Sequence, residues 1–368
     1  MVIEDIALTM VPRLGVRGVA HLMDLYHSAA RVYTEPSHRL ILCAELRDDI
    51  VERILQKEGF AAAERELKYC AANGIKATAS TDPDYPYHLL EIPDRPHVIY
   101  SMGDIEALQS PHILSVVGTR RISTYGENVC ARILSDLAAM FPDLVVVSGL
   151  AYGVDAAAHH VALASGVRTV AVMANKLPDI IPAQHKSLAK DIIDNGGAII
   201  SELHSQTKQN GAFYIPRNRI VAGVAQGLLV VESAANGGSL STVKAADDYS
   251  RTVMAVPGRI FDSRSEGTNH LIKTNVAQLV TSAEDIAEAL GWEVAGAMPE
   301  RMRYEPRDVN PQEAKVLSAL ADNSDGLSME LIAAKTALSV SELSAILLNM
   351  ELSGLVEGFD YLSASQKV

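Results

Sequence analysis

The stretch LVVVSGLAYGVDAAAHHVAL, residues 144–163, decides the fold class. It opens with a run that is apolar on both faces, which is typical of a strand buried on both sides, and continues through a glycine-containing loop into a helical pattern. Further runs of this kind are ILSVVG at 113–118, TVAVMA at 169–174, AIISE at 198–202, GLLVVES at 227–233 and TVMAVPG at 252–258. Because these runs alternate with amphipathic stretches, the sequence predicts an α/β fold with a doubly wound, mostly parallel, Rossmann-like sheet.

The chain before this region has a different pattern. Residues 1–75 carry apolar positions at three- and four-residue steps, which predicts helices without a strand. Within them, Gly15 and Gly18 stand between two short apolar stretches, which fits a SAM-like or helix-hairpin-helix module whose turn offers N–H groups to a phosphate. A plain helical packing module fits the same pattern. Residues 81–104 are rich in proline and turn formers, and we expect a linker there.

The C-terminal part reads as a small separate domain. Residues 291–311 lack periodicity, as a linker would, and three helical stretches followed by a short hairpin then predict a winged helix. Its expected recognition helix, residues 340–354, contains Glu342 and Glu351 and no lysine or arginine, which favours a protein contact over duplex DNA. The predicted domains are therefore helical 1–78, Rossmann-like 79–292, linker 293–308 and winged helix 309–368.

Composition limits the possible functions. The 368 residues are 48% hydrophobic and 21% charged, as in a globular protein, and the net charge of −13 argues against binding of nucleic acid through bulk attraction. Any phosphate site must then be local. We expect a cytoplasmic protein without membrane contact, because the chain shows neither a signal-peptide pattern nor a long apolar run. Cys43, Cys70 and Cys130 are too widely spaced for a metal knuckle and are expected to be buried free thiols.

Loops at the ends of the predicted strands carry the candidate site. In an open parallel sheet, ligands bind beyond the carboxyl ends of the strands, where helix N-termini offer N–H groups to anions. Small residues and arginines that could hold phosphates follow three of the strands: Gly118, Thr119, Arg120 and Arg121; Ser148 and Gly149; Gly238 and Ser239. The sequence therefore predicts one phosphate or polyanion site where these loops converge. The dinucleotide pattern G-x-G-x-x-G is absent from the first loop, and no cofactor is expected.

A further segment joins positive charge to aromatic rings. Lys208 precedes Phe213 and Tyr214, and Arg217, Asn218 and Arg219 follow at the start of an apolar helix. A cation beside an aromatic ring suits a nucleotide, with the charge on the phosphate and the ring under the base. The rings could equally anchor the loop to the core, and one arginine is expected to pair with an acid inside the protein.

Residues with catalytic potential lack supporting patterns. His159 and His160 are adjacent and point about 100° apart on a helix, so they cannot share a metal ion. Asp155 is expected to be the N-cap of its helix, and no G-x-S-x-G elbow supports a triad of Ser148, His159 and Asp155. No catalytic or metal-binding residue is therefore assigned.

The motifs VVGTRR, VSGLAYGVDAAAH, PRNRIVAG, VVESAANGGSLSTVKAA, AVPG and GTNHLI occur in this order between about residues 80 and 290. With them, the chain resembles the DNA-processing protein A family, also called DprA or Smf. The resemblance implies an extended Rossmann fold that binds and protects single-stranded DNA, forms a homodimer and loads the RecA recombinase during natural transformation, without catalysis.

The resemblance also implies roles for single residues. The family's G-S/T-R turn falls on Gly118, Thr119 and Arg120, where a backbone phosphate would sit, and its aromatic before R-N-R falls on Tyr214. Where the family has Phe-Pro, this chain has Tyr214-Ile215. The family's groove lysine has two candidates here, Lys208 and Lys186.

Two other functions fit the sequence. A nucleotide phosphoribohydrolase of the lysine-decarboxylase-like Rossmann group also uses glycine-rich loops, but its PGGxGTxxE loop corresponds here to NGGSLSTVKAA, so that Glu232 or Glu202 would have to supply the acid. A scaffold whose terminal domains bind proteins is the second alternative.

Overall fold

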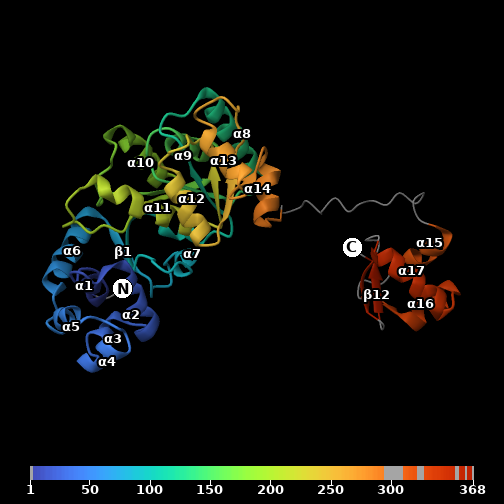
Figure 1. Cartoon of the computed structure of the whole chain (residues 1–368), viewed down its shortest axis with the longest axis horizontal. Helices are drawn as coiled ribbons and strands as arrows, with labels where there is room; N and C mark the ends of the chain where they lie inside the picture. The colour runs from blue at the N-terminus through green and yellow to red at the C-terminus, as the bar shows by residue number, and fades with distance from the viewer. Residues whose placement is uncertain (1–2, 294–309, 321–326, 353–355, 361–362, 367–368) are drawn as a thin grey trace. The chain divides into compact units, whose positions relative to one another are not determined.

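The computed structural model describes residues 3–293, 310–320, 327–352, 356–360 and 363–366. They belong to two compact units that divide after Val294 (Figure 1). The predicted helical region is confirmed in the first unit, where the N-terminal helices are α1 (Ile3–Thr9), α2 (Gly15–Tyr26), α3 (Ala29–Val32), α4 (Ser37–Leu42), α5 (Asp48–Leu55) and α6 (Phe60–Asn73).

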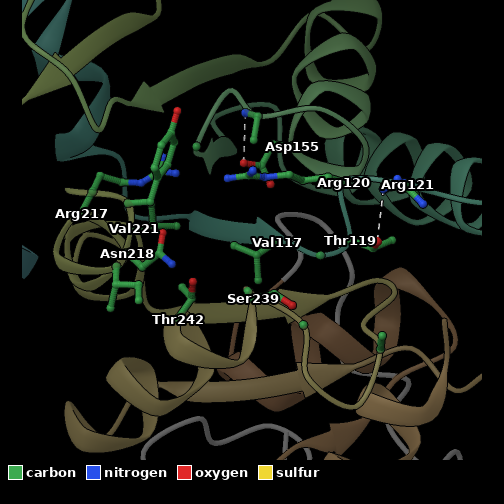
Figure 2. Close-up of a pocket in the computed structure, with 18 residues that line it drawn as sticks. Val117, Thr119, Arg120, Arg121, Asp155, Arg217, Asn218, Val221, Ser239 and Thr242 are labelled. Atoms are coloured by element: carbon green, nitrogen blue, oxygen red, sulfur yellow. Dashed lines mark hydrogen bonds between the residues drawn. The ribbon is translucent and has the colours of Figure 1, made fainter. Parts of the chain in front are cut away.

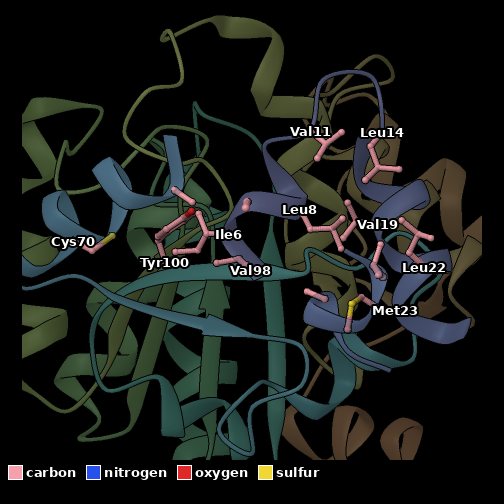
Figure 3. Packing of buried hydrophobic residues seen from close by; sticks show 14 of the residues in the cluster. Ile6, Leu8, Val11, Leu14, Val19, Leu22, Met23, Cys70, Val98 and Tyr100 are labelled. Atoms are coloured by element: carbon pink, nitrogen blue, oxygen red, sulfur yellow. The ribbon is translucent and has the colours of Figure 1, made fainter. Parts of the chain in front are cut away.

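The N-terminal helices pack directly on the sheet. Buried Ile6 of α1 and Val19 of α2 belong to the same apolar cluster as Val98 and Tyr100 of a sheet strand (Figure 3). Burial of such side chains contributes roughly 1.5–3 kcal/mol each. The helices and the sheet therefore share one core, and the predicted limit at residue 78 falls within a strand, at Lys76–Ala79.

One sheet of nine strands organises the first unit. Its order is β1-β2-β6-β5-β4-β3-β7-β8-β9, and all neighbours from β6 to β9 pair in parallel. The strands are β1 (Lys76–Ala79), β2 (Val98–Gly103), β3 (Ile113–Val117), β4 (Val145–Ser148), β5 (Arg168–Val172), β6 (Ala198–Ser201), β7 (Gly227–Val230), β8 (Thr252–Ala255) and β9 (Gln278–Leu279). The predicted doubly wound, mostly parallel sheet is confirmed.

Helices cover both faces of this sheet, as its doubly apolar strands require. Within β4, Val145 and Val147 face one core cluster and Val146 faces the other, because side chains alternate along a strand. One face carries α8 (Thr124–Met140), α9 (Val154–Ala164), α10 (Lys186–Asp194) and α14 (Ala283–Leu290). The other carries α11 (Tyr214–Gly223), α12 (Leu240–Asp248) and α13 (Glu266–Lys273).

The linker predicted at 81–104 is wrong. This segment contains the short helix α7 (Tyr87–Leu90) and strand β2, and η1 (Ile105–Gln109) follows it. Tyr85, Leu89 and Ile92 are at most 2% exposed and belong to the core of the sheet. Strand β2 pairs antiparallel with both β1 and β6. Pro83 and Pro93 lie in turns, and the buried apolar residues between the prolines pack the segment against the core.

The second unit has the predicted winged-helix pattern. Its helices are α15 (Pro311–Leu320), α16 (Met329–Thr336) and α17 (Val340–Leu352), and its antiparallel sheet consists of β10 (Leu327–Ser328), β11 (Val356–Asp360) and β12 (Ser363–Gln366). Its own core includes Val316, Ile332 and Leu343. The predicted linker 293–308 lies outside the described residues except for residue 293.

Two smaller expectations can be compared with the described residues. Cys70 and Cys130 are buried free thiols as expected, but Cys43 is exposed, so that expectation is wrong for it. No single described helix is long and apolar enough to cross a bilayer, although α16 and α17 together meet that criterion across a 104° bend.

His159 gives the first unit a specific sensitivity to acid. It is fully buried, and its Nδ1 lies 2.7 Å from the Thr169 hydroxyl oxygen, which itself donates to the Val146 carbonyl. Nδ1 must therefore carry the proton and donate to that hydroxyl. Burial lowers the pKa of His159 from 6.5 to about 3, so the unfolded chain binds an extra proton between these pH values and stability falls as the pH drops below 6.5.

We expect the His159→Phe variant to lose this part of the pH dependence. Between pH 7.5 and pH 5, the free energy of unfolding of the native protein should fall by roughly 2 kcal/mol more than that of the variant. Urea unfolding of both proteins at the two pH values measures the difference. Equal changes in both proteins would show that His159 has the same pKa in the folded and the unfolded protein.

Candidate functional site

A crevice of about 530 Å³ lies at the carboxyl ends of β3, β4 and β7 (Figure 2). Strand β3 is the point where the order of the sheet reverses, since β4 to β6 lie on one side of it and β7 to β9 on the other. Ligands of open α/β sheets bind at such switch points. The crevice collects these predicted residues: Gly118, Thr119, Arg120, Arg121, Gly149, Tyr214, Arg217, Asn218, Gly238 and Ser239.

The loop after β3 supplies positive charge. The Thr119 N–H donates to the Glu232 carbonyl at 2.8 Å. The Arg121 N–H donates to the Thr119 hydroxyl at 3.1 Å (Figure 2), and together these bonds fix the turn. Arg120 and Arg121 are exposed, and neither forms an ion pair with any described residue. The Arg120 guanidinium lies 5.2 Å from the centre of the Tyr214 ring. A free cation and an aromatic face thus meet at the mouth of the crevice.

The loop after β4 and the start of α9 form the second wall. The Ala151 N–H donates to the Asp155 carboxylate at 3.2 Å, and this side chain is 8% exposed. The predicted N-cap role of Asp155 is wrong, because Gly153 is the N-cap and Asp155 is the second residue of the helix. The carboxylate instead accepts a hydrogen bond from the loop before the helix, and this bond helps to fix the loop backbone at Ala151.

The Arg217 side chain lies next to Gly149 of this loop. It is 6% exposed and donates to the Val172 carbonyl at the end of β5. A Cβ atom on Gly149 would lie 2.6 Å from the Arg217 guanidinium carbon, so only glycine leaves room for that side chain. Burial lowers the pKa of Arg217 and raises that of Asp155, and each group opposes the shift of the other. Arg217 and Asp155 are therefore two buried groups of opposite charge that line the crevice and influence each other's pKa.

The loop after β7 supplies backbone donors. Ser239 donates through its hydroxyl to Ser233 at 3.0 Å, and α12 begins directly afterwards. A Cβ on Gly238 would meet nothing within 4 Å, so this glycine faces open space. The backbone N–H groups of Gly238 and Ser239 have no hydrogen-bond partner in the described part of the chain. N–H groups arranged in this way before a helix receive anions.

The remaining predicted residues lie elsewhere. Ser148 is fully buried and its hydroxyl donates to the Val116 carbonyl at 2.7 Å. Arg219 is the arginine that pairs with an acid, because its guanidinium lies 2.6 Å from a Glu202 carboxylate oxygen. Lys186 and Lys208 are exposed, and neither lines the crevice. Phe213 lines a different cavity.

Some lining residues were not predicted. Ile215 lies between two predicted positions at the start of α11, and Thr242 stands one helical turn after the glycines of the β7 loop. The helical period could have indicated Thr242, since residues three apart share a helix face. Asp155 was noticed in the sequence, but nothing there indicated its approach to Arg217.

Comparison with known proteins places this site in a family. Residues 76–291 match the sequence family described as DNA recombination-mediator protein A, and residues 301–358 match the DprA winged helix domain. Protein Smf of Escherichia coli is 36% identical over 276 residues, which are 74% of this chain and 72% of that protein.

Solved structures agree with this match. The structure of DNA processing protein A from Streptococcus pneumoniae superposes with a TM-score of 0.66 at 29% identity and covers 78% of this chain and 98% of its own. That of Helicobacter pylori, described as having a unique single-stranded DNA binding mode, has a TM-score of 0.53 at 24% identity and covers 61% and 98%. The predicted resemblance is confirmed: the chain belongs to the DNA recombination-mediator protein A family, the DprA/Smf proteins, which process DNA.

Proposed function

We propose that the crevice binds single-stranded DNA and catalyses no reaction. The observation that carries this proposal is the Arg120 guanidinium over the Tyr214 ring. An unpaired strand offers a charged phosphate and a flat base in close succession, and this pair matches both. Backbone N–H groups of Gly238 and Ser239 supply further phosphate donors on the opposite wall.

The charge distribution supports local binding despite the acidic chain. Arg120 and Arg121 project from the loop after β3 without an acidic partner among the described residues, and Arg217 lies below them. Among the described residues, Asp155 is the only acidic one that lines the crevice, and burial raises its pKa. The net charge of −13 is thus compatible with a positive crevice.

The wider role follows from family membership and remains a proposal. We infer that the protein protects the bound strand, loads RecA on it during natural transformation, and acts in the cytoplasm as a homodimer through the Rossmann-like domain. The Helicobacter pylori structure, whose description names single-stranded DNA binding, supports single-stranded DNA as the proposed ligand. The winged helix is proposed to contact protein, because the described part of α17 exposes Val340, Glu342 and Leu348 and no basic side chain.

The phosphoribohydrolase alternative is less well supported. Its two candidate acids are engaged elsewhere: Glu232 accepts hydrogen bonds from the backbone and hydroxyl of Ser123, and Glu202 pairs with Arg219. Neither carboxylate lines the crevice. Incubation with nucleoside monophosphates tests this directly, and release of free base would overturn the non-catalytic proposal.

We expect the Arg120→Ala variant to bind a single-stranded oligonucleotide at least tenfold more weakly. A hydrogen bond to a charged group contributes roughly 1.5–3 kcal/mol, and a factor of ten corresponds to about 1.4 kcal/mol. The slope of log K against log salt should fall by about 0.7 for each lost phosphate contact. Fluorescence anisotropy at several salt concentrations measures both quantities.

Arg132→Ala is the matched control. Arg132 lies on α8 with its side chain 86% exposed, and it pairs with Asp136 at 3.9 Å, so its loss removes the same charge away from the crevice. Equal affinities and salt slopes for the two variants would exclude Arg120 from the site. Repeating the titration with duplex DNA tests the preference for an unpaired strand.

A further inference from the structure

A second cavity, of about 400 Å³, lies where the N-terminal helices meet the sheet. Its apolar lining includes Val16 and Val19 of α2, Val98 of β2, Leu203 after β6 and Phe213 before α11. Figure 3 shows Val19 and Val98 in the packing around this junction. We call this space the junction cavity. Its volume lies within the range of roughly 300–1,000 Å³ that is usual for small-ligand sites.

The junction cavity and the crevice share one wall. Phe213 and Pro216 line the junction cavity, while Tyr214, Ile215 and Arg217 line the crevice. The wall is therefore the first turn of α11 together with the residue before it. A strand that leaves the Tyr214 face needs to cross only this turn to reach the Phe213 face.

The chemistry of the junction cavity differs from that of the crevice. Its lining residues, all of them described, include no lysine or arginine, and its one glutamate, Glu202, is paired with Arg219. This lining does not suit a phosphate. It suits a neutral, flat group with an apolar face and a polar edge, since Phe213 offers a ring for stacking.

His204 supplies a polar group without a protein partner. His204 lines the junction cavity. Its Nδ1 is buried without a hydrogen-bond partner among the described residues, and its Nε2, which is not buried in this way, makes no hydrogen bond with them either. Burial lowers the pKa of His204, so the imidazole is neutral at pH 7 and offers one donor and one acceptor. A buried polar atom of this kind is usually satisfied by a partner such as water or a ligand.

We propose that the junction cavity receives one nucleobase of the strand held in the crevice. The base stacks on Phe213 and presents its polar edge to His204, while the phosphates stay with Arg120 on the other side of the shared wall. This inference rests on the proposed strand binding and deepens it. It makes the N-terminal helices part of the binding site, because α2 forms the far side of the cavity.

The Phe213→Trp variant tests the proposal by fluorescence. The only other tryptophan is Trp292, which is 9% exposed and packs on Phe141 at a ring distance of 5.3 Å, away from the cavity lining. Single-stranded oligonucleotide should quench the new tryptophan, and a strand of equal length whose bases are all replaced by hydrogen should bind without quenching. The native protein gives the background from Trp292.

Val16→Trp provides a second test, because this larger side chain fills the cavity from the α2 side. It should weaken binding of the normal strand about tenfold, as expected for the loss of one stacked base, and leave binding of the base-free strand unchanged. If the native protein binds neither strand, the proposed function itself fails. If it binds the normal strand, but the tryptophan at position 213 is not quenched and Val16→Trp binds as tightly as native protein, the junction cavity takes no base.

Discussion

Replacing Arg217 by methionine is expected to lower the free energy of unfolding by roughly 3–5 kcal/mol, the range for removing one partner of a buried charge pair. The change leaves Asp155, which is 8% exposed, without its nearby cation, and it leaves the Val172 carbonyl without its donor. Methionine fills most of the space, so the loss reports the charge rather than a cavity. Urea unfolding followed by circular dichroism measures it.

The loss should depend on pH in a defined direction. Burial already raises the pKa of Asp155, and without Arg217 this pKa rises further. The folded variant then binds a proton that the unfolded chain has released above its ordinary pKa of 3.8. Stability must therefore fall as the pH rises through that window, and the difference from native protein should grow as the pH rises above 3.8.

A double-mutant cycle isolates the pair. Asp155→Asn keeps an acceptor for the Ala151 N–H but removes the charge, so the double variant with Arg217→Met should be more stable than the sum of the two single losses implies. Arg132→Met, on the exposed face of α8, should change stability by less than about 0.5 kcal/mol. Strict additivity within the cycle would mean that Arg217 and Asp155 do not interact.

The central sheet could be predicted because its strands are buried on both faces. ILSVVG and LVVVSG became β3 and β4, and their carboxyl ends had to meet at one edge once the sheet was parallel. That constraint brought Arg120, Gly149 and Ser239 together without knowledge of side-chain positions. The convergence of the loops on one crevice is a consequence of topology.

The segment before β3 could not be predicted in the same way. Strand β2 stands among prolines, and its partners β1 and β6 run antiparallel to it. Such a strand depends on contacts with α1 and α6 that are distant in sequence, including Tyr100 against the cluster around Ile6. Local propensity indicates a loop here, and tertiary packing overrides it.

Side-chain direction limited the prediction of the site. Lys208 and Tyr214 are close in sequence, but Lys208 is exposed outside the crevice and the cation over the Tyr214 ring is Arg120, from a loop more than ninety positions earlier. Phe213 and Tyr214 face different cavities because they stand on either side of the start of α11. Sequence spacing shows that Phe213 and Tyr214 are neighbours along the chain. It does not show that their side chains line different cavities.

Gly153→Ala is expected to impair strand binding most strongly, because Gly153 lies where the loop before α9 contacts the loop after β3. The Val154 N–H donates to the Thr119 carbonyl at 3.1 Å, which joins the start of α9 to the β3 loop. Gly153 has φ 78° and ψ −125°, and a Cβ atom there would collide with that carbonyl and lie 2.6 Å from the Arg120 carbonyl carbon. These atoms are backbone, so the strain can be relieved only by moving the loop that carries Arg120.

We expect Gly153→Ala to lose roughly 3 kcal/mol of stability or more, from backbone strain and the displaced loop, and to bind single-stranded DNA more than tenfold more weakly. Gly166→Ala is the matched control: Gly166 follows the C-terminal end of the same helix at φ 73°, and a Cβ atom there meets nothing within 4 Å. It should cost only about 1 kcal/mol and leave strand affinity unchanged. Both substitutions place alanine at positive φ, and Gly153→Ala adds the collision with the β3 loop and the strain of a ψ of −125°. If both variants bind DNA equally well in anisotropy titrations, the position of that loop does not determine strand binding.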